Sequence, residues 1–104
     1  MFIDKEPDAL YQKFADKVYA PNALDSKTKE LIALACSVMA DCVPCIEYHY
    51  PKVKEHGASD AEIREAMAIT MTVAAGSKQA KCWKLIGELS SLEIFHKGRE
   101  LFDE

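Results

Sequence analysis

Apolar residues recur every three or four positions along most of the chain, which is the spacing of one face of an α-helix. Three such stripes precede residue 75, and polar turns separate them. They comprise Leu10, Phe14 and Val18; Leu31, Ala35 and Val38; and Ile63, Met67, Thr70, Met71 and Ala74. No segment alternates apolar and polar residues as a half-buried strand does. The pattern therefore predicts an all-α fold.

Turn-forming residues divide the predicted helices at four places. These are Pro21-Asn22, Asp41 to Pro44, His56 to Ser59, and Gly76-Ser77. Gly57 is typical of the position just past a helix end, and Ser59 with Glu62 forms a capping box that starts the next helix. After Trp83 the chain is either one long helix or two helices broken between Gly87 and Ser91. The sequence thus predicts about five to six helices in a single domain of residues 1–104.

Two of the predicted helices are apolar on more than one face. From Leu31 to Ala40 every residue except Ser37 is apolar, and only Thr70 and Thr72 interrupt the run from Ala66 to Ala75. A helix at the surface of a monomer needs a narrower apolar stripe than this. We therefore expect copies of the same chain to cover some of these faces, the alternative being a central hairpin inside a monomer.

The composition is that of one ordinary globular domain. Of 104 residues, 49% are hydrophobic, 29% charged and 9% aromatic, unlike a disordered or collagenous chain. The formal net charge is −4 and the pI is near 5.4, with both signs scattered along the sequence. Such a chain lacks the basic surface that nucleic-acid binding requires, so we expect no nucleic-acid partner.

The sequence also gives no sign of a membrane span or a signal peptide. The uncharged stretch from Met67 to Ser77 is about half of the roughly 20 residues that a spanning helix needs. Met1 to Leu10 carries three acidic residues where a signal peptide is basic and then apolar. We therefore expect a cytoplasmic protein. In that reducing compartment, four cysteines are better explained as catalytic, metal-binding or core residues than as a disulfide framework.

The most informative segment contains two cysteines separated by two residues, Cys42 and Cys45. Pro44 fits the first turn of a helix, so the pair is predicted to lie at a helix N-terminus. Free N–H groups and the positive end of the helix dipole stabilise a thiolate there. His49 lies one turn after Cys45 and can exchange the thiol proton, and Glu30 is the candidate carboxylate that orients His49.

Other uses of these residues remain open at this stage. Cys42 and Cys45 could supply half of a zinc site, with His49 as a third ligand and Glu30 or Cys36 as a fourth. A second pair of spaced cysteines is missing, and Ile46 replaces the histidine that covalent haem attachment requires. The two remaining cysteines, Cys36 and Cys82, are interpreted as small buried apolar side chains, and an iron–sulfur cluster is disfavoured.

Glu30, Cys42, Cys45 and His49 together follow the spacing E-x11-C-x2-C-x3-H. The sequence from about Asp25 to Gly87 thereby resembles the alkylhydroperoxidase D-like branch of the carboxymuconolactone decarboxylase family. The resemblance implies an all-helical domain that assembles as a homotrimer or homohexamer with active sites near subunit interfaces. It also implies that Cys42 and Cys45 cycle between dithiol and disulfide while Glu30 and His49 relay protons. Pro44 departs from the pattern, because peroxidase members often carry a second histidine at that position.

We therefore interpret the chain as a thiol–disulfide oxidoreductase with alkylhydroperoxidase-type activity. Its catalytic residues would be Cys42, Cys45, His49 and Glu30, and it would need no bound cofactor or metal. The expected partners are a peroxide or disulfide substrate and a redox partner protein or small thiol donor. Either cysteine could attack first, since Cys42 is nearer the helix end and Cys45 nearer His49. The alternatives are a decarboxylase-like lyase that does not need both sulfurs and a metal-binding structural oligomer.

Overall fold

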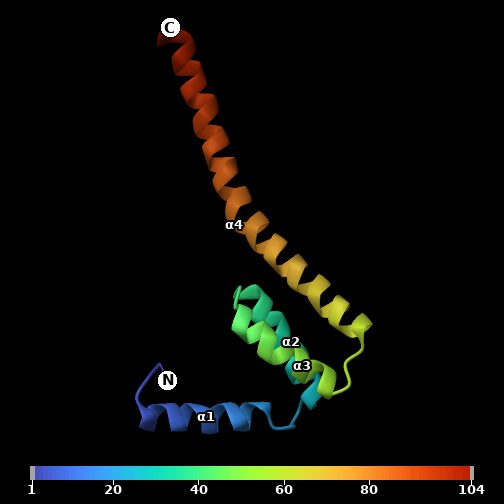
Figure 1. Cartoon of the computed structure of the whole chain (residues 1–104). Helices are drawn as coiled ribbons and strands as arrows, with labels where there is room; N and C mark the ends of the chain where they lie inside the picture. The colour runs from blue at the N-terminus through green and yellow to red at the C-terminus, as the bar shows by residue number, and fades with distance from the viewer. Residues whose placement is uncertain (1, 104) are drawn as a thin grey trace. The chain divides into compact units, whose positions relative to one another are not determined.

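A computed structural model describes residues 2–103 of the chain, with side chains up to residue 92. Within that range the chain forms helices and no strand, so the all-α prediction is confirmed. The helices are α1 (Lys5–Tyr19), α2 (Ser26–Met39), α3 (Val43–Glu55) and α4 (Asp60–Asp103), as Figure 1 shows. Across the same residues there is no helix with the length and hydropathy needed to cross a membrane.

The predicted number of helices was too high, because the described chain has four rather than five or six. The expected break at Gly76-Ser77 does not occur, and α4 also continues through Gly87 without interruption. A glycine inside a helix costs only about 1 kcal/mol relative to alanine, and the residues around Gly76 are mostly strong helix formers. The long-helix alternative for the segment after Trp83 is therefore the correct one.

The chain consists of two compact units, Met1–Thr70 and Met71–Glu104. The first unit contains α1, α2, α3 and the beginning of α4, and the second contains the rest of α4. All four residues of the sequence motif belong to the first unit. A single domain covering residues 1–104 remains a prediction.

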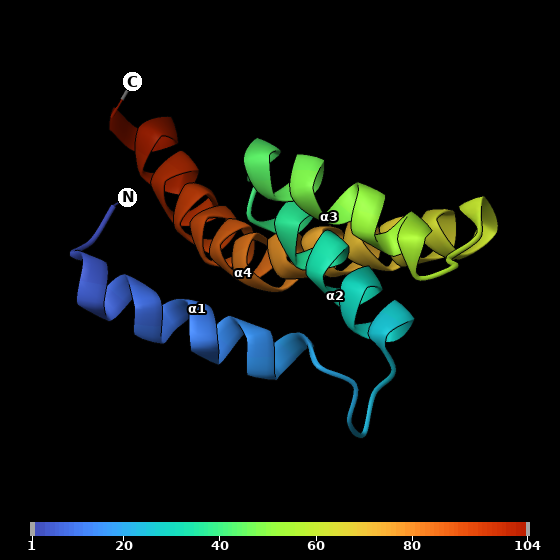
Figure 2. The same ribbon diagram turned by 60° about the horizontal axis from the view of Figure 1, so that its bottom comes forward.

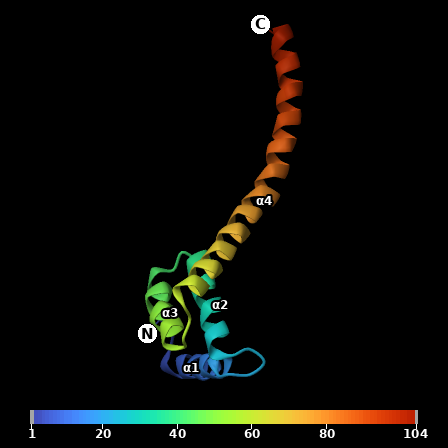
Figure 3. The same ribbon diagram turned by 90° about the vertical axis from the view of Figure 1, so that its right-hand side faces the viewer.

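Helices α2 and α3 form the structural centre of the first unit. They lie side by side in two views of the molecule (Figures 1 and 2) and pack directly against each other. Helix α1 lies at the end of this pair where α2 begins, and it contacts α2 (Figure 3). The core between α2, α3 and the beginning of α4 is built from Leu34, Val53, Ala58 and Ile63, with Leu31, Ile46 and Met67 packed around them. Because this core is small, the two paired helices hold the site in place mainly through their mutual contact.

The turn from α2 to α3 places Cys42 at the start of α3. Asp41 adopts a left-handed backbone conformation with φ of 53°, which aspartate tolerates better than most residues. Its N–H donates to the carbonyl of Val38 at 3.0 Å, and the N–H of Cys42 donates to the carbonyl of Ser37 at 3.0 Å. These two bonds are the Schellman motif that ends α2. The chain therefore reverses within two residues and places Cys42 as the N-cap of α3.

The turn from α3 to α4 confirms both predicted signals. Gly57 has φ of +86°, and the N–H groups of Gly57 and Ala58 donate to the carbonyls of Lys54 and Val53. Ser59 and Glu62 form the reciprocal capping box, with the Ser59 N–H donating to Glu62 Oε1 at 2.9 Å and the Glu62 N–H to Ser59 Oγ at 3.1 Å. The sequence around Gly57 therefore specifies where α3 ends and α4 begins.

The Gly57→Ala variant should be less stable by roughly 1–2 kcal/mol, because a Cβ disfavours the left-handed conformation. Nothing lies within 4 Å of the added Cβ, so the loss measures the backbone conformation and not a clash. Gly76→Ala is the matched control, since it also has open space around the Cβ but lies inside α4. Gly76→Ala should raise the free energy of unfolding by up to about 1 kcal/mol. Urea unfolding followed by circular dichroism measures both, and equal changes in the two variants would contradict this interpretation.

Candidate active site

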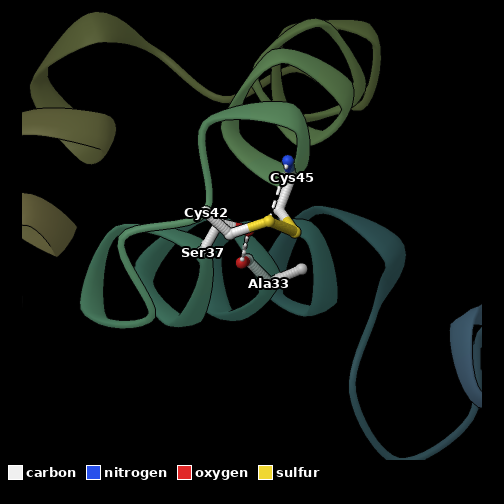
Figure 4. Close-up of a disulfide and its surroundings, with 4 residues drawn as sticks. All are labelled: Ala33, Ser37, Cys42 and Cys45. Carbon is white, nitrogen blue, oxygen red and sulfur yellow. Dashed lines mark hydrogen bonds between the residues drawn. A yellow bond between two sulfur atoms is a disulfide. The ribbon is translucent and has the colours of Figure 1, made fainter.

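Cys42 and Cys45 form a disulfide at the N-terminus of α3. The two Cα atoms are 5.2 Å apart, and the Cys45 N–H donates to the Cys42 Sγ atom at 3.3 Å (Figure 4). Pro44 occupies the second position of the helix, as its missing N–H allows. The expected helix start within one residue of Pro44 is confirmed. The pair is thus placed where the helix dipole stabilises negative charge on sulfur.

The last turn of α2 is hydrogen-bonded to the start of α3 through Ser37. Ser37 is buried, and its hydroxyl donates to the carbonyl of Ala33 at 2.7 Å (Figure 4). The Ser37 carbonyl in turn accepts the N–H of Cys42. Because the hydroxyl and carbonyl of Ser37 both have partners, this buried residue adds no unpaired polar group beneath the disulfide.

Glu30 and His49 meet between α2 and α3. The Glu30 Oε2 atom lies 2.8 Å from His49 Nδ1, and their side chains are 8% and 13% exposed. A carboxylate this close holds Nδ1 as the protonated nitrogen and leaves Nε2 for proton exchange. The structure therefore brings together the carboxylate and the histidine that the motif predicts. Their catalytic roles remain predictions.

Two tyrosines contact the His49 ring, and neither of them was predicted to belong to the site. The Tyr48 ring lies edge-on at 5.0 Å between centroids, and the Tyr19 ring is tilted at 5.6 Å. Burial raises the pKa of the Tyr19 hydroxyl, and the negative charge of Glu30 raises it further. The Tyr19 phenol is therefore neutral at physiological pH. No local sequence signal could have identified Tyr19, because it lies on α1, whereas the motif residues belong to α2, α3 and the turn between them.

Two cavities open beside the disulfide, and both contain Cys45 and His49 in their walls. The first, called the apolar cavity, has a volume of about 610 Å³. Its walls include Val18, Leu24, Ile32, Ala33 and Ala40. The second, called the polar cavity, has a volume of about 540 Å³. Its walls include Gln12, Asp16, Ser26, Glu30 and Lys52. Small molecules can therefore approach Cys45 through two chemically different spaces.

Comparisons with known proteins agree with the family resemblance of the motif formed by Glu30, Cys42, Cys45 and His49. The sequence profile of the carboxymuconolactone decarboxylase family matches residues 6–87. The chain belongs to the carboxymuconolactone decarboxylase family. A Paracoccus denitrificans relative, named uncharacterized protein 4 in cox locus, is 31% identical over 86 residues, which are 83% of this chain and 78% of that protein.

Solved structures show the same relationship. A carboxymuconolactone decarboxylase family protein from Thermotoga maritima, described with a possible role in antioxidative response, has a TM-score of 0.66 and 32% identity. The similarity covers 92% of this chain and 99% of that one. A protein from Methanobacterium thermoautotrophicum has a TM-score of 0.74 and 27% identity over 83% of this chain and 99% of its own. The matched region includes Glu30, Cys42, Cys45 and His49 of this family member.

The remaining cysteines of this carboxymuconolactone decarboxylase family member differ from expectation. Cys36 is exposed and lines the apolar cavity, and Cys82 is half-buried. Their predicted full burial is therefore wrong, because neither side chain is buried among the residues that the structure describes. Among the side chains that the structure describes, no three histidine, cysteine or acidic residues converge as metal ligands. The zinc set considered from the sequence thus has no matching geometry in the disulfide form.

Proposed function

We propose that the chain is a thiol–disulfide oxidoreductase with alkylhydroperoxidase-type activity. The observation that carries the proposal is the Cys42–Cys45 disulfide at a helix N-terminus, with Cys45 sharing two cavities with the His49–Glu30 pair. This arrangement combines a dithiol that can close reversibly with a base beside one sulfur. The T. maritima family member described with a possible antioxidative role supports the same reading.

The proposed oxidation begins with both cysteines reduced. His49 accepts the Cys45 thiol proton, and the Cys45 thiolate attacks the terminal oxygen of a hydroperoxide. An S–O bond forms, the O–O bond breaks, and the departing alkoxide takes the proton from His49 to leave as an alcohol. The Cys42 thiol then attacks the sulfenic acid, the disulfide forms, and water leaves. Two electrons pass from the dithiol to the peroxide.

Cys45 is the better candidate for the attacking cysteine. It lines both cavities together with His49, so a substrate in either space can reach it. The Cys42 sulfur instead accepts the Cys45 N–H as the N-cap of α3. That hydrogen bond stabilises negative charge on the Cys42 sulfur, which suits a leaving group when the disulfide is reduced.

The cycle is completed by a thiol donor. A redox partner protein or a small thiol reduces the disulfide by two successive exchanges, and the donor leaves as a disulfide. The proposal includes a reducing compartment such as the cytoplasm, where such donors are available. It assigns no metal or bound cofactor to the reaction, because the two sulfurs carry both electrons.

A thiol titration tests the proposed function directly. Fully reduced protein is treated with one equivalent of cumene hydroperoxide, and its thiols, metal content and peptide map are measured. We expect the loss of two thiols per chain and a Cys42–Cys45 peptide. Unchanged thiols would reject the proposal, with one zinc per chain favouring a metal-binding oligomer and no zinc favouring a decarboxylase-like lyase.

We also propose that the chain works as a homotrimer or homohexamer. Apolar side chains stay exposed on both helices for which the sequence predicted subunit contacts, including Met39 at 43%, Met71 at 73% and Val73 at 54%. A further row on α4 is more than half exposed, and we call it the α4 apolar stripe. It consists of Leu85, Ile86, Leu89 and Leu92. Neighbouring copies of the chain are the proposed cover for these faces.

The Leu89→Glu variant should dissociate the oligomer, because it places a charge at the centre of the α4 apolar stripe. Ser77→Glu is the matched control, since it adds the same charge to α4 about three turns earlier and about 120° around the helix axis. Light scattering behind size-exclusion chromatography should show a wild-type mass of several chains. We expect a smaller particle for Leu89→Glu and the wild-type mass for Ser77→Glu. A monomeric wild-type protein would contradict the proposed assembly.

A further inference from the structure

The two cavities share a wall. Among the residues that the structure describes, three line both cavities: Tyr19 from α1, and Cys45 and His49 from α3. Tyr19 and His49 are in ring contact at 5.6 Å. The wall between the cavities thus contains one sulfur of the disulfide, the candidate base and an aromatic ring. Each side of this wall offers a separate approach to Cys45.

The apolar cavity offers few polar groups to a ligand. The Lys29 side chain reaches its wall, but the ammonium donates to the carbonyl of Val18 at 2.7 Å and to that of Ala20. The Ser37 hydroxyl is likewise committed to the Ala33 carbonyl at 2.7 Å. Because these groups already have partners, the wall outside the shared residues is aliphatic except for the Cys36 thiol, and it favours an apolar ligand.

The polar cavity is of mixed character: its wall includes Ala15, Pro44 and Tyr48, but it offers more charged and hydrogen-bonding groups than the apolar cavity. Asp16 and Lys52 place charges of both signs on its wall, and Gln12 and Ser26 add neutral hydrogen-bonding groups. Glu30 belongs to the same wall and is bound to His49 there. Charged groups keep their hydration in such a space, so hydrophilic molecules enter it at lower cost than they enter the apolar cavity.

We propose that the two half-reactions use different entrances to Cys45: an apolar organic hydroperoxide reaches it through the apolar cavity, and a hydrophilic thiol reductant through the polar cavity. This inference rests on the proposed function and specifies the route of each substrate. With separate entrances, the reductant can reach the disulfide while the alcohol product is still in the apolar cavity. Tyr19 and His49 form the partition between the two routes.

The reduction step follows from this geometry. The donor thiolate attacks the Cys45 sulfur from the polar cavity, a mixed disulfide forms, and the Cys42–Cys45 bond breaks. Cys42 leaves as a thiolate, and the Cys45 N–H that its sulfur accepts stabilises this leaving group. A second donor thiol then attacks the donor sulfur of the mixed disulfide. It releases the oxidised donor, and the two protons lost by the donor thiols return Cys42 and Cys45 to thiols.

A matched pair of substitutions separates the two entrances. Ala40→Phe narrows the apolar cavity, and Ala15→Phe narrows the polar cavity, of which Ala15 also forms part of the wall. Both variants make the same chemical change. Oxidation by cumene hydroperoxide and reduction by dithiothreitol are followed separately by rapid quenching with an alkylating reagent, which counts free thiols with time.

We expect Ala40→Phe to slow oxidation by about tenfold while reduction keeps its wild-type rate, and Ala15→Phe to do the reverse. Variants that slow both half-reactions equally, or that leave both unchanged, would overturn the separate entrances. If either phenylalanine variant fails to fold, Val18→Trp and Gln12→Trp make the same comparison at exposed positions of α1. A wild-type protein that gains and loses no thiols would instead overturn the proposed function itself.

Discussion

The Cys42→Ser/Cys45→Ser variant should lose hydroperoxide turnover by about a thousandfold or more. Both electrons in the proposed cycle come from this pair, whose sulfurs are bonded to each other at the start of α3. A serine hydroxyl has the size of the thiol but cannot form the disulfide or reduce a peroxide. The measurement is the consumption of cumene hydroperoxide coupled to dithiothreitol oxidation, at equal protein concentrations. Cys82→Ser, a change in α4 at a cysteine outside the motif, is the control and should keep wild-type turnover.

The single variants should divide the reaction into its two chemical steps. Cys45→Ser should abolish oxidation, because the remaining cysteine, Cys42, lines neither cavity and does not meet the peroxide. Cys42→Ser should still consume one equivalent of peroxide and stop as a sulfenic acid on Cys45, detectable by a dimedone adduct. Exchanged outcomes would make Cys42 the attacking residue. Full hydroperoxide turnover by the double variant would reject Cys42 and Cys45 as the source of the electrons.

The local structure of this chain follows closely from its sequence. Asp25 caps α2 by accepting the Thr28 N–H at 2.7 Å, and this hydrogen bond lowers the pKa of the Asp25 carboxyl. Gly57 and the Ser59 capping box mark the boundary of α3 and α4 as expected. Pro44 marks the start of α3. Each signal acts within one turn of helix, so the bonds that satisfy the helix ends can be predicted from neighbouring residues alone.

Features that depend on distant residues were predictable only in part. Asp41 carries the left-handed turn at the end of α2, a position more typical of glycine, so its role there could not be assigned. Gly76 suggested a break that α4 does not make, because helix continuation depends on the summed propensity of its neighbours. Tyr19 reaches His49 from another helix. Such contacts are set by the packing of helices, which residue spacing within one helix does not encode.

The contact between Glu30 and His49 was predictable in part. The residues are 19 positions apart on different helices, so helical periodicity alone could not show that their side chains meet. The family spacing suggested the pairing, and the packing of α2 against α3 provides it through a contact of 2.8 Å. Both side chains are largely buried, at 8% and 13% exposure, so the packing of the two helices holds this contact away from bulk water.

Replacing His49 with alanine should slow oxidation at neutral pH by about a hundredfold. Without the imidazole, the attacking thiol has no base beside it, so half-ionisation of that thiol should move to higher pH. The rate of the variant should therefore recover as the pH is raised, because hydroxide can then form the thiolate. Rate against pH is measured with cumene hydroperoxide, and thiolate formation by absorbance at 240 nm. Glu47→Ala, an exposed change on the same helix, should leave both curves unchanged.

Glu30→Gln tests whether the carboxylate acts through His49. Glutamine preserves the shape of the buried side chain but removes the charge that stabilises an imidazolium at 2.8 Å. We expect a loss of about tenfold at neutral pH, smaller than that of His49→Ala, with the same recovery at high pH. In the Glu30→Gln/His49→Ala double variant the two losses should not add, because a positioning residue has no effect once the base is absent. Full additivity, or an ionisation curve that His49→Ala leaves unmoved, would show that this pair stabilises the fold and takes no part in proton transfer.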